Sequence, residues 1–210
     1  MNPLNFFSGI ENATGNDLKS AVQAFGKQAS ADLSLPHYDT RYGVIGIAPL
    51  ADSASGDVSL AVISVVHEAV QISDIFQVNL RGADPNLSSH LRALLTFMGN
   101  SPWVSFRSDY GLKTLNRYFE EACAHRIDPD WLDLAALLPA CFPEEKAHCA
   151  LLDDWLRRYE LDTDRPDAVS DALSSARLFL RVLGVRKPGE HLNAGELFRA
   201  QKAHRSVEWR

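Results

Sequence analysis

The 210-residue chain is long enough for one α/β domain with short terminal extensions and too short for two large domains. Its formal charge of −6 opposes non-specific binding of a polyanion, because that binding is driven by lysine and arginine side chains that displace counterions. Neither a long apolar run nor a basic stretch followed by an apolar core is visible, so we expect no membrane span, no secretory signal and a cytoplasmic location.

Residues 1–40 read as an appendage, in which apolar positions between residues 17 and 30 predict an amphipathic helix. This helix is interpreted as a packing arm, with a dimer contact as the alternative. Residues 42–48 and 58–66 are apolar, β-branched runs that predict strands, and the alternating residues 69–79 predict a third. These strands form a hairpin or, if the first one joins, a three-stranded meander.

Beyond these strands the apolar period becomes helical. A short strand is expected at residues 103–106, and helices are expected at residues 87–98, 112–122, 131–138, 151–159 and 166–183. The order β-β-β-α-β-α-α-α-α predicts an α/β fold with a mixed sheet. The large aromatic residues of these helices are assigned to the core because they fall on apolar faces; they are Trp131, Trp155 and Phe179.

The cysteines and the basic residues near the C-terminus indicate no special chemistry. The cysteines stand at irregular spacing, which argues against a disulfide framework, and with His148 they lack the C-x-x-C pair typical of a zinc site. The basic tail is interpreted as a solvated helix end in preference to a polyanion-binding patch. The residues concerned are Cys123, Cys141 and Cys149, and Arg186, Lys187, Arg199, Lys202, Arg205 and Arg210.

Three blocks carry a family resemblance. Residues 165–172 read Arg-Pro-Asp-Ala-Val-Ser-Asp-Ala, after Trp-Leu-Asp-Leu-Ala at 131–135 and Leu-Asp-Asp-Trp-Leu at 152–156. Together these stretches resemble the C-terminal block of the DEDDh 3′–5′ exonucleases, a ribonuclease H-like family that includes the proofreading epsilon subunit of bacterial DNA polymerase III. Residues 165–172 are similar to the third motif of that family, R-H-x-A-x-x-D-A. The resemblance puts Asp171 at a metal-binding aspartate and Pro166 at the general-base histidine.

The other two blocks resemble the first and second exonuclease motifs. Residues 102–115 are similar to a strand, a Phe-Asp pair and a helix, with Gly111 at the second metal-binding aspartate. Residues 44–49 are similar to the strand that carries D-x-E, with Gly46 at the aspartate and Ala48 at the glutamate. The resemblance therefore implies a ribonuclease H-like mixed sheet flanked by helices, with an N-terminal helical arm, and a site that has lost most of its carboxylates.

Phosphodiester hydrolysis in this family uses two divalent ions, Mg²⁺ or Mn²⁺, held by several carboxylates. One carboxylate, Asp171, remains, and it also has a structural explanation, because the amide dipoles of a helix N-terminus favour an acidic residue. Asp52 and Asp57, in the loop after the first strand, are the substitutes at the correct end of that strand. Asp39 precedes the strand and Asp109 falls in a turn, so both are poorly placed.

These losses predict a degenerate, catalytically inactive exonuclease-like domain that binds a nucleotide, a nucleic acid or a protein, with no cofactor. One alternative is an active, divergent exonuclease that uses Asp171 with Asp52 or Asp57 and Mg²⁺ or Mn²⁺. The other is a pure interaction protein or homodimer, formed through residues 17–30 or 196–210. The expected division is an arm at 1–40, the exonuclease-like domain at 41–185 and an extension at 186–210. Whether the old cleft is open or collapsed is left open.

Overall fold

A computed structural model describes residues 13–28, 31–51, 56–146, 148–161, 164–165, 167–185 and 193–208. Its strands are β1 (Tyr42–Pro49), β2 (Val58–Val66), β3 (Ala69–Leu80), β4 (Trp103–Ser105) and β5 (Trp131–Asp133). Its α-helices are α1 (Gly15–Lys27), α2 (Leu87–Met98), α3 (Ser108–Cys123), α4 (Leu134–Cys141), α5 (Leu152–Arg158), α6 (Ala168–Leu183) and α7 (Ala194–Glu208). Two short 3₁₀ helices are η1 (His37–Asp39) and η2 (Pro143–Glu145).

The strands form a five-stranded sheet in the order β3-β2-β1-β4-β5. β1, β2 and β3 are an antiparallel meander, while β4 and β5 run parallel to β1. The turn between β2 and β3 places His67 and Glu68 at φ values of 52° and 55°, a backbone twist that suits a tight hairpin. This is the ribonuclease H-like mixed sheet flanked by helices, and the meander is the second of the two arrangements that the sequence allows.

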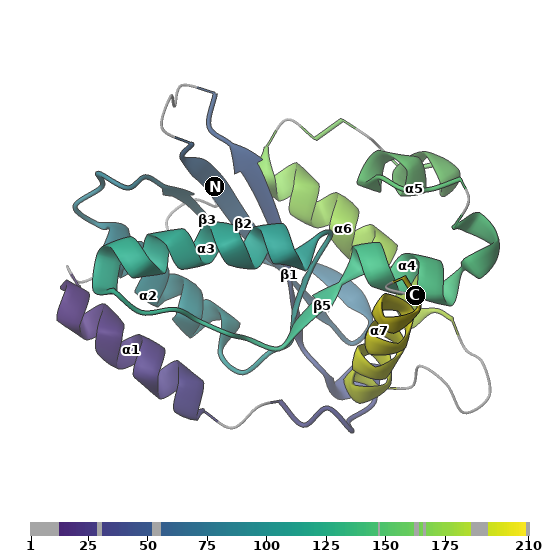
Figure 1. Cartoon of the computed structure of the whole chain (residues 1–210), viewed down its shortest axis with the longest axis horizontal. Coiled ribbons are helices and arrows are strands. Elements are labelled where there is room, and N and C mark those ends of the chain that lie inside the picture. Colours follow the sequence, from purple (N-terminus) through teal and green to yellow (C-terminus); the bar gives the residue numbers. More distant parts are fainter. Residues whose placement is uncertain are drawn as a thin grey trace.

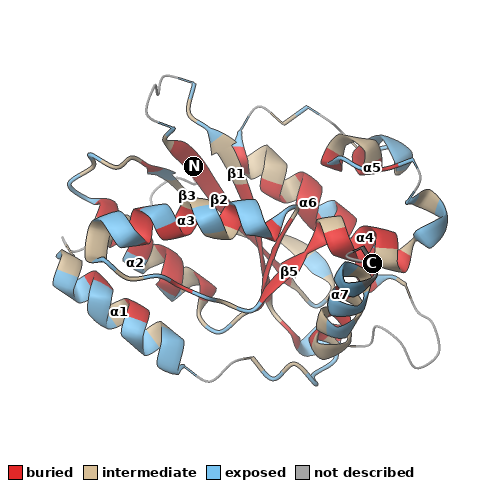
Figure 2. Ribbon diagram, viewed as in Figure 1, coloured by how far each residue is buried: buried red, intermediate tan, exposed pale blue. Residues whose placement is uncertain are grey.

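Helices cover both faces of the sheet (Figure 1). One core packs α1, α2 and α3 against the sheet, and the other packs α4, α5, α6 and α7 against it. The central strands are buried from both sides (Figure 2), as expected for nearly uninterrupted apolar runs. The three aromatic residues assigned to the core are buried, which confirms that assignment for Trp131, Trp155 and Phe179.

α6 approaches the sheet unusually closely, over β1 and β2. Its side chains at Ala168, Ala172 and Ala176 recur every fourth residue, so they line one face of the helix, and each is fully buried. The helix begins at an N-cap, Asp167, whose carboxylate accepts a hydrogen bond from the Ser170 amide at 2.8 Å. Small side chains on this face let the helix backbone lie directly on the strands.

The prediction of a helix over residues 131–138 is wrong at its beginning. Residues 131–133 are β5, which pairs with β4, and the helix that follows, α4, begins at Leu134 and continues through Pro139. A strand of three buried residues has no period that distinguishes it from a buried helical turn. The pairing with β4, formed by residues about 28 positions earlier, decides its conformation.

Both terminal extensions pack against the central domain. α1, capped by Thr14 and Asp17, lies against α2 and α3, and α7 lies against α4 and β5. The two extensions also meet each other, because the Gly195 amide donates to the Leu33 carbonyl at 2.9 Å. The helical arm is thus observed, whereas the three-part division of the chain stays a prediction. Across the described residues, no helix combines the length and apolar character that a membrane crossing requires.

Candidate functional site

The positions singled out by the resemblance meet around the carboxyl half of β1. Gly46 and Ala48 lie on this strand, and Asp171 lies in the first turn of α6. Ile47 joins them to the other side of the sheet: its amide donates a long hydrogen bond, 3.4 Å, to Asp171, and its side chain lies close to Gly111 in α3. Gly46, Ala48 and Asp171 therefore lie together, Gly111 lies across the strand from them beside Ile47, and Pro166 lies outside the described residues.

The space at Gly46 is filled by the backbone of α6. A Cβ atom on Gly46 would lie 2.2 Å from the Ala168 carbonyl oxygen and 2.4 Å from the Ala172 amide nitrogen. Real Cβ atoms do not approach other atoms so closely, and helix backbone cannot swing aside as a side chain can. No side chain, and so no carboxylate, fits at this position while α6 remains in place.

The space at Gly111 is filled by a side chain. A Cβ atom there would lie 2.9 Å and 3.0 Å from two carbon atoms of the Trp131 ring. That ring is held by a hydrogen bond of 2.9 Å from its Nε1 to the Ser105 hydroxyl and by packing against Trp103, with ring centroids 5.1 Å apart. At Gly46 and Gly111, where the resemblance expects carboxylates, the space is thus filled by the α6 backbone and the Trp131 ring, which answers the question whether glycine leaves an open cleft there.

Asp171 is paired with an arginine. Arg165 donates to its Oδ1 at 2.6 Å, and the same guanidinium forms a second ion pair with Asp153 of α5. The Arg165 side chain is 19% exposed and that of Asp171 is 23% exposed, so the pair is largely removed from water. A fixed positive charge of the protein itself therefore lies beside the one carboxylate that the resemblance assigns to a metal site.

Burial raises the pKa of Asp171 above its ordinary value of 3.8, and Arg165 and the Ile47 amide offset only part of this rise. Between the unfolded and folded pKa values the native state holds more protons than the unfolded state, so stability falls as pH rises. We therefore expect the stability of the wild type relative to Asp171→Asn to be highest below pH 3.8 and to fall as pH rises through the folded-state pKa. Urea denaturation of both proteins between about pH 3.5 and 7.5 measures this difference.

A difference that instead grows as pH rises would mean that Arg165 outweighs burial and lowers the pKa of Asp171. The amide side chain of asparagine keeps the size of the residue, so packing contributes little to the comparison.

The loop carboxylates do not join this cluster. Asp57 precedes β2, and its Oδ1 accepts a hydrogen bond of 3.4 Å from the Gly82 amide, just beyond β3. This hydrogen bond holds the Asp57 side chain near the end of β3, whereas Asp171 lies on the side of β1 that faces α6. Asp52 lies outside the described residues. Asp39, in η1, precedes β1 and so lies at the opposite end of that strand, as predicted.

The residues do not fit a pair of divalent ions. Within the described residues, no group of three or more His, Cys, Asp or Glu side chains is arranged to hold a metal ion. The positions that would supply further ligands are occupied by the α6 backbone and the Trp131 ring. We therefore assign no catalytic step to a metal in this protein.

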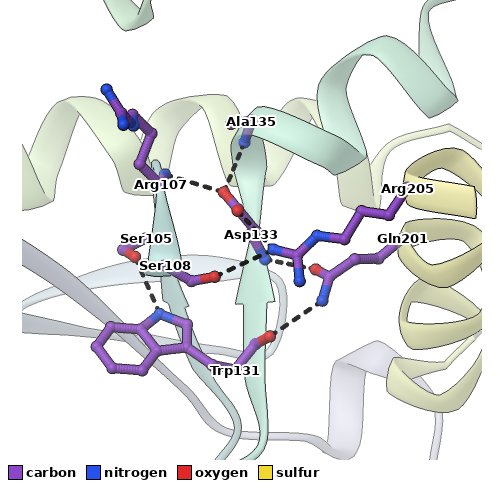
Figure 3. Close-up of polar contacts among 8 residues, drawn as sticks. All are labelled: Ser105, Arg107, Ser108, Trp131, Asp133, Ala135, Gln201 and Arg205. Carbon is purple, nitrogen blue, oxygen red and sulfur yellow. Dashed lines mark hydrogen bonds and ion pairs between the residues drawn. The ribbon is translucent and has the colours of Figure 1, made fainter. Parts of the chain in front are cut away.

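Asp133 ends β5, the edge strand of the sheet, and forms polar contacts with four other residues. The sequence did not lead us to expect a role for it. It is 5% exposed, and its Oδ1 accepts hydrogen bonds from the Arg107 and Ala135 amides, each 2.9 Å long. Its Oδ2 forms an ion pair with Arg205 of α7 at 2.7 Å (Figure 3). An acidic residue between a short apolar run and a helical pattern is an N-cap signal that could have identified it.

α7 also covers the free edge of β5. The Gln201 side chain accepts from the Asp133 amide at 2.6 Å and donates to the Trp131 carbonyl at 3.2 Å (Figure 3). These are the bonds that a neighbouring strand would make, so the glutamine closes an otherwise unpaired strand edge. The interpretation of the tail as a solvated helix end is therefore wrong for Arg205, whose charge is used internally.

Comparison of the sequence with the models of known protein families and with curated proteins finds no match.

Proposed function

We propose that this chain is a non-catalytic, exonuclease-like domain that acts as a binding module. The ribonuclease H-like strand order and the meeting of Gly46, Ala48 and Asp171 support the proposed relationship to the DEDDh exonucleases. Two-metal hydrolysis needs several oxygen ligands in fixed geometry, and the arrangement here offers one, already neutralised by Arg165.

The observation that carries the proposal is the contact between Gly46 and α6. Loss of a carboxylate by itself could leave a cavity that another acidic residue enters. Here the backbone atoms of Ala168 and Ala172 occupy the position, so no neighbouring side chain can supply the ligand from that point. The alternative, an active enzyme that uses Asp171 with a loop carboxylate, requires α6 to move away from β1 first.

We expect the full-length protein to leave 5′-labelled single-stranded DNA and RNA intact in the presence of Mg²⁺ or Mn²⁺. Denaturing gels after long incubation measure this directly. The Asp171→Asn protein, purified in the same way, is the control, because a contaminating nuclease would act equally in both preparations. Stepwise shortening from the 3′ end that disappears in Asp171→Asn would overturn the proposal.

Thermal unfolding provides a second arm of the same experiment. An ion that binds only the folded state at 100 times its Kd stabilises that state by about 2.7 kcal/mol, which corresponds to a shift of several degrees. We expect no such shift with Mn²⁺ at about 5 mM relative to a buffer that contains a chelator. A saturable shift that is lost in Asp171→Asn would support the active alternative.

A further inference from the structure

A hollow of about 490 Å³ lies on the outer side of α3. Its walls come from this helix, from Gly56 before β2 and from Arg126 beyond the end of α3. From α3 itself come Tyr110, Lys113 and Arg117, which lie three, four and seven residues apart and so share one face of the helix. The hollow therefore brings together residues 56–58 and residues 110–126, which are separated in the sequence by β3 and α2. For this reason no local sequence motif marks it.

The charge of this hollow is opposite to that of the whole chain. Three basic side chains line it, those of Lys113, Arg117 and Arg126, against one acidic side chain, Glu120. The chain as a whole carries a formal charge of −6. Glu120 is matched by Arg126 through an ion pair of 3.2 Å, so the hollow keeps an excess of positive charge.

Arg117 is held in place before any ligand arrives. One terminal nitrogen donates to the Gly56 carbonyl and to the Tyr118 hydroxyl, each at 2.7 Å. Its guanidinium also lies over the Tyr118 ring, 4.6 Å from the centroid. A pre-positioned guanidinium loses less entropy on binding a carboxylate than a free one does. Lys113, four residues earlier, forms no ion pair within the described part of the chain.

Tyr110 adds an exposed aromatic ring to the same face. Tyr110 is 50% exposed, in the first turn of α3, whereas every tryptophan among the described residues is buried. Tyrosine and arginine are the residue types that most often dominate the binding energy of protein interfaces. The combination of a ring, a fixed guanidinium and a lysine is typical of a protein-binding surface.

We propose that this hollow on α3 is the docking site for a short acidic segment of a partner protein. Carboxylates of the segment would pair with Lys113, Arg117 and the remaining nitrogens of Arg126, and an adjacent apolar side chain would pack on Tyr110. A peptide is favoured over a nucleic acid because the hollow offers three basic side chains, enough for a short acidic segment, and the overall negative charge repels a long polyanion. The inference rests on the proposed binding role and supplies its partner class.

The test measures binding of a fluorescein-labelled hexaglutamate peptide to the full-length protein by fluorescence anisotropy at low salt. We expect saturable binding that weakens at least about tenfold in Lys113→Glu, because an attraction becomes a repulsion. Lys202→Glu, the same charge reversal on the exposed face of α7, is the matched control and should weaken binding less than about twofold. Circular dichroism melting checks that both variants fold.

Three outcomes would overturn the inference. They are the absence of peptide binding at low salt, equal weakening in both variants, and tighter binding of an oligothymidylate that Lys113→Glu abolishes. The last would assign the hollow to nucleic acid. None of them alters the hydrolysis result, so failure of this site and failure of the non-catalytic proposal are distinguishable.

Discussion

Replacing Gly46 by alanine is expected to destabilise the protein by about 3 kcal/mol, the upper range for overpacking of a core. The added methyl group would meet the Ala168 carbonyl oxygen and the Ala172 amide nitrogen at 2.2 Å and 2.4 Å. Relief requires α6 to move away from β1, which exposes the buried alanine face of that helix. Urea denaturation, with the change in free energy of unfolding taken at constant m-value, measures the cost.

Two other glycines are matched controls for this substitution. Gly26, in α1, has no atom within 4 Å of the place that an added methyl group would take. Gly26→Ala should therefore increase the free energy of unfolding by about 1 kcal/mol, because alanine has the higher helix propensity. At Gly111 the added methyl group would meet the Trp131 ring at 2.9 Å, a less severe overlap than the 2.2 Å at Gly46, so the change in stability for Gly111→Ala should fall between the other two. A cost below about 1 kcal/mol for Gly46→Ala would mean that α6 separates easily from β1, and space for a side chain could then open beside Gly46.

Replacing Arg165 by alanine is expected to cost about 2–3 kcal/mol at neutral pH, because it leaves Asp171 as a largely buried, uncompensated charge. Asp171→Asn in the Arg165→Ala background should recover part of that loss, since no buried carboxylate then remains. A double-mutant cycle from urea denaturation isolates the coupling between the two residues.

The control is Arg126→Ala, which breaks an ion pair of 3.2 Å with Glu120 in which the two side chains are 68% and 50% exposed. Exposed pairs contribute little because water screens them, so we expect a loss well below that of Arg165→Ala. Equal losses in Arg165→Ala and Arg126→Ala would show that Asp171 does not depend on its guanidinium partner, and would weaken the view that Arg165 neutralises this carboxylate.

Together these two predictions separate two ways in which the proposed relative of the exonucleases could be inactive. If only the ligands were missing, restoring Gly46→Asp and Gly111→Asp could restore metal binding. If the walls have closed, as the contacts with α6 and Trp131 indicate, the same substitutions would unfold the protein before they could bind an ion. The non-catalytic proposal depends on the second case, and the Gly46→Ala measurement addresses it without any assay of activity.

Much of the fold could be predicted from the sequence because its signals are local. The β-branched run of β2 predicts a strand, and the recurrence of alanine at every fourth position of α6 predicts a helix, without reference to the rest of the chain. β5 could not be predicted, because a run of three buried residues is too short to show the alternation of a strand. Its conformation depends on pairing with β4. The amphipathic pattern of α1 likewise predicted a helix but not the helices against which it packs.

The candidate site divides in the same way. Residue identity by itself determined that the positions of the resemblance hold Gly46, Ala48 and Gly111 in place of carboxylates, and that Asp171 lies near the start of a helix. Only the tertiary structure decided that the space beside Gly46 and Gly111 is filled, that a guanidinium accompanies Asp171, and that basic side chains gather on α3. The physical reason is that the sequence shows directly which side chains and charges each position has. What fills the space beside a glycine depends on packing between segments that are distant in the sequence.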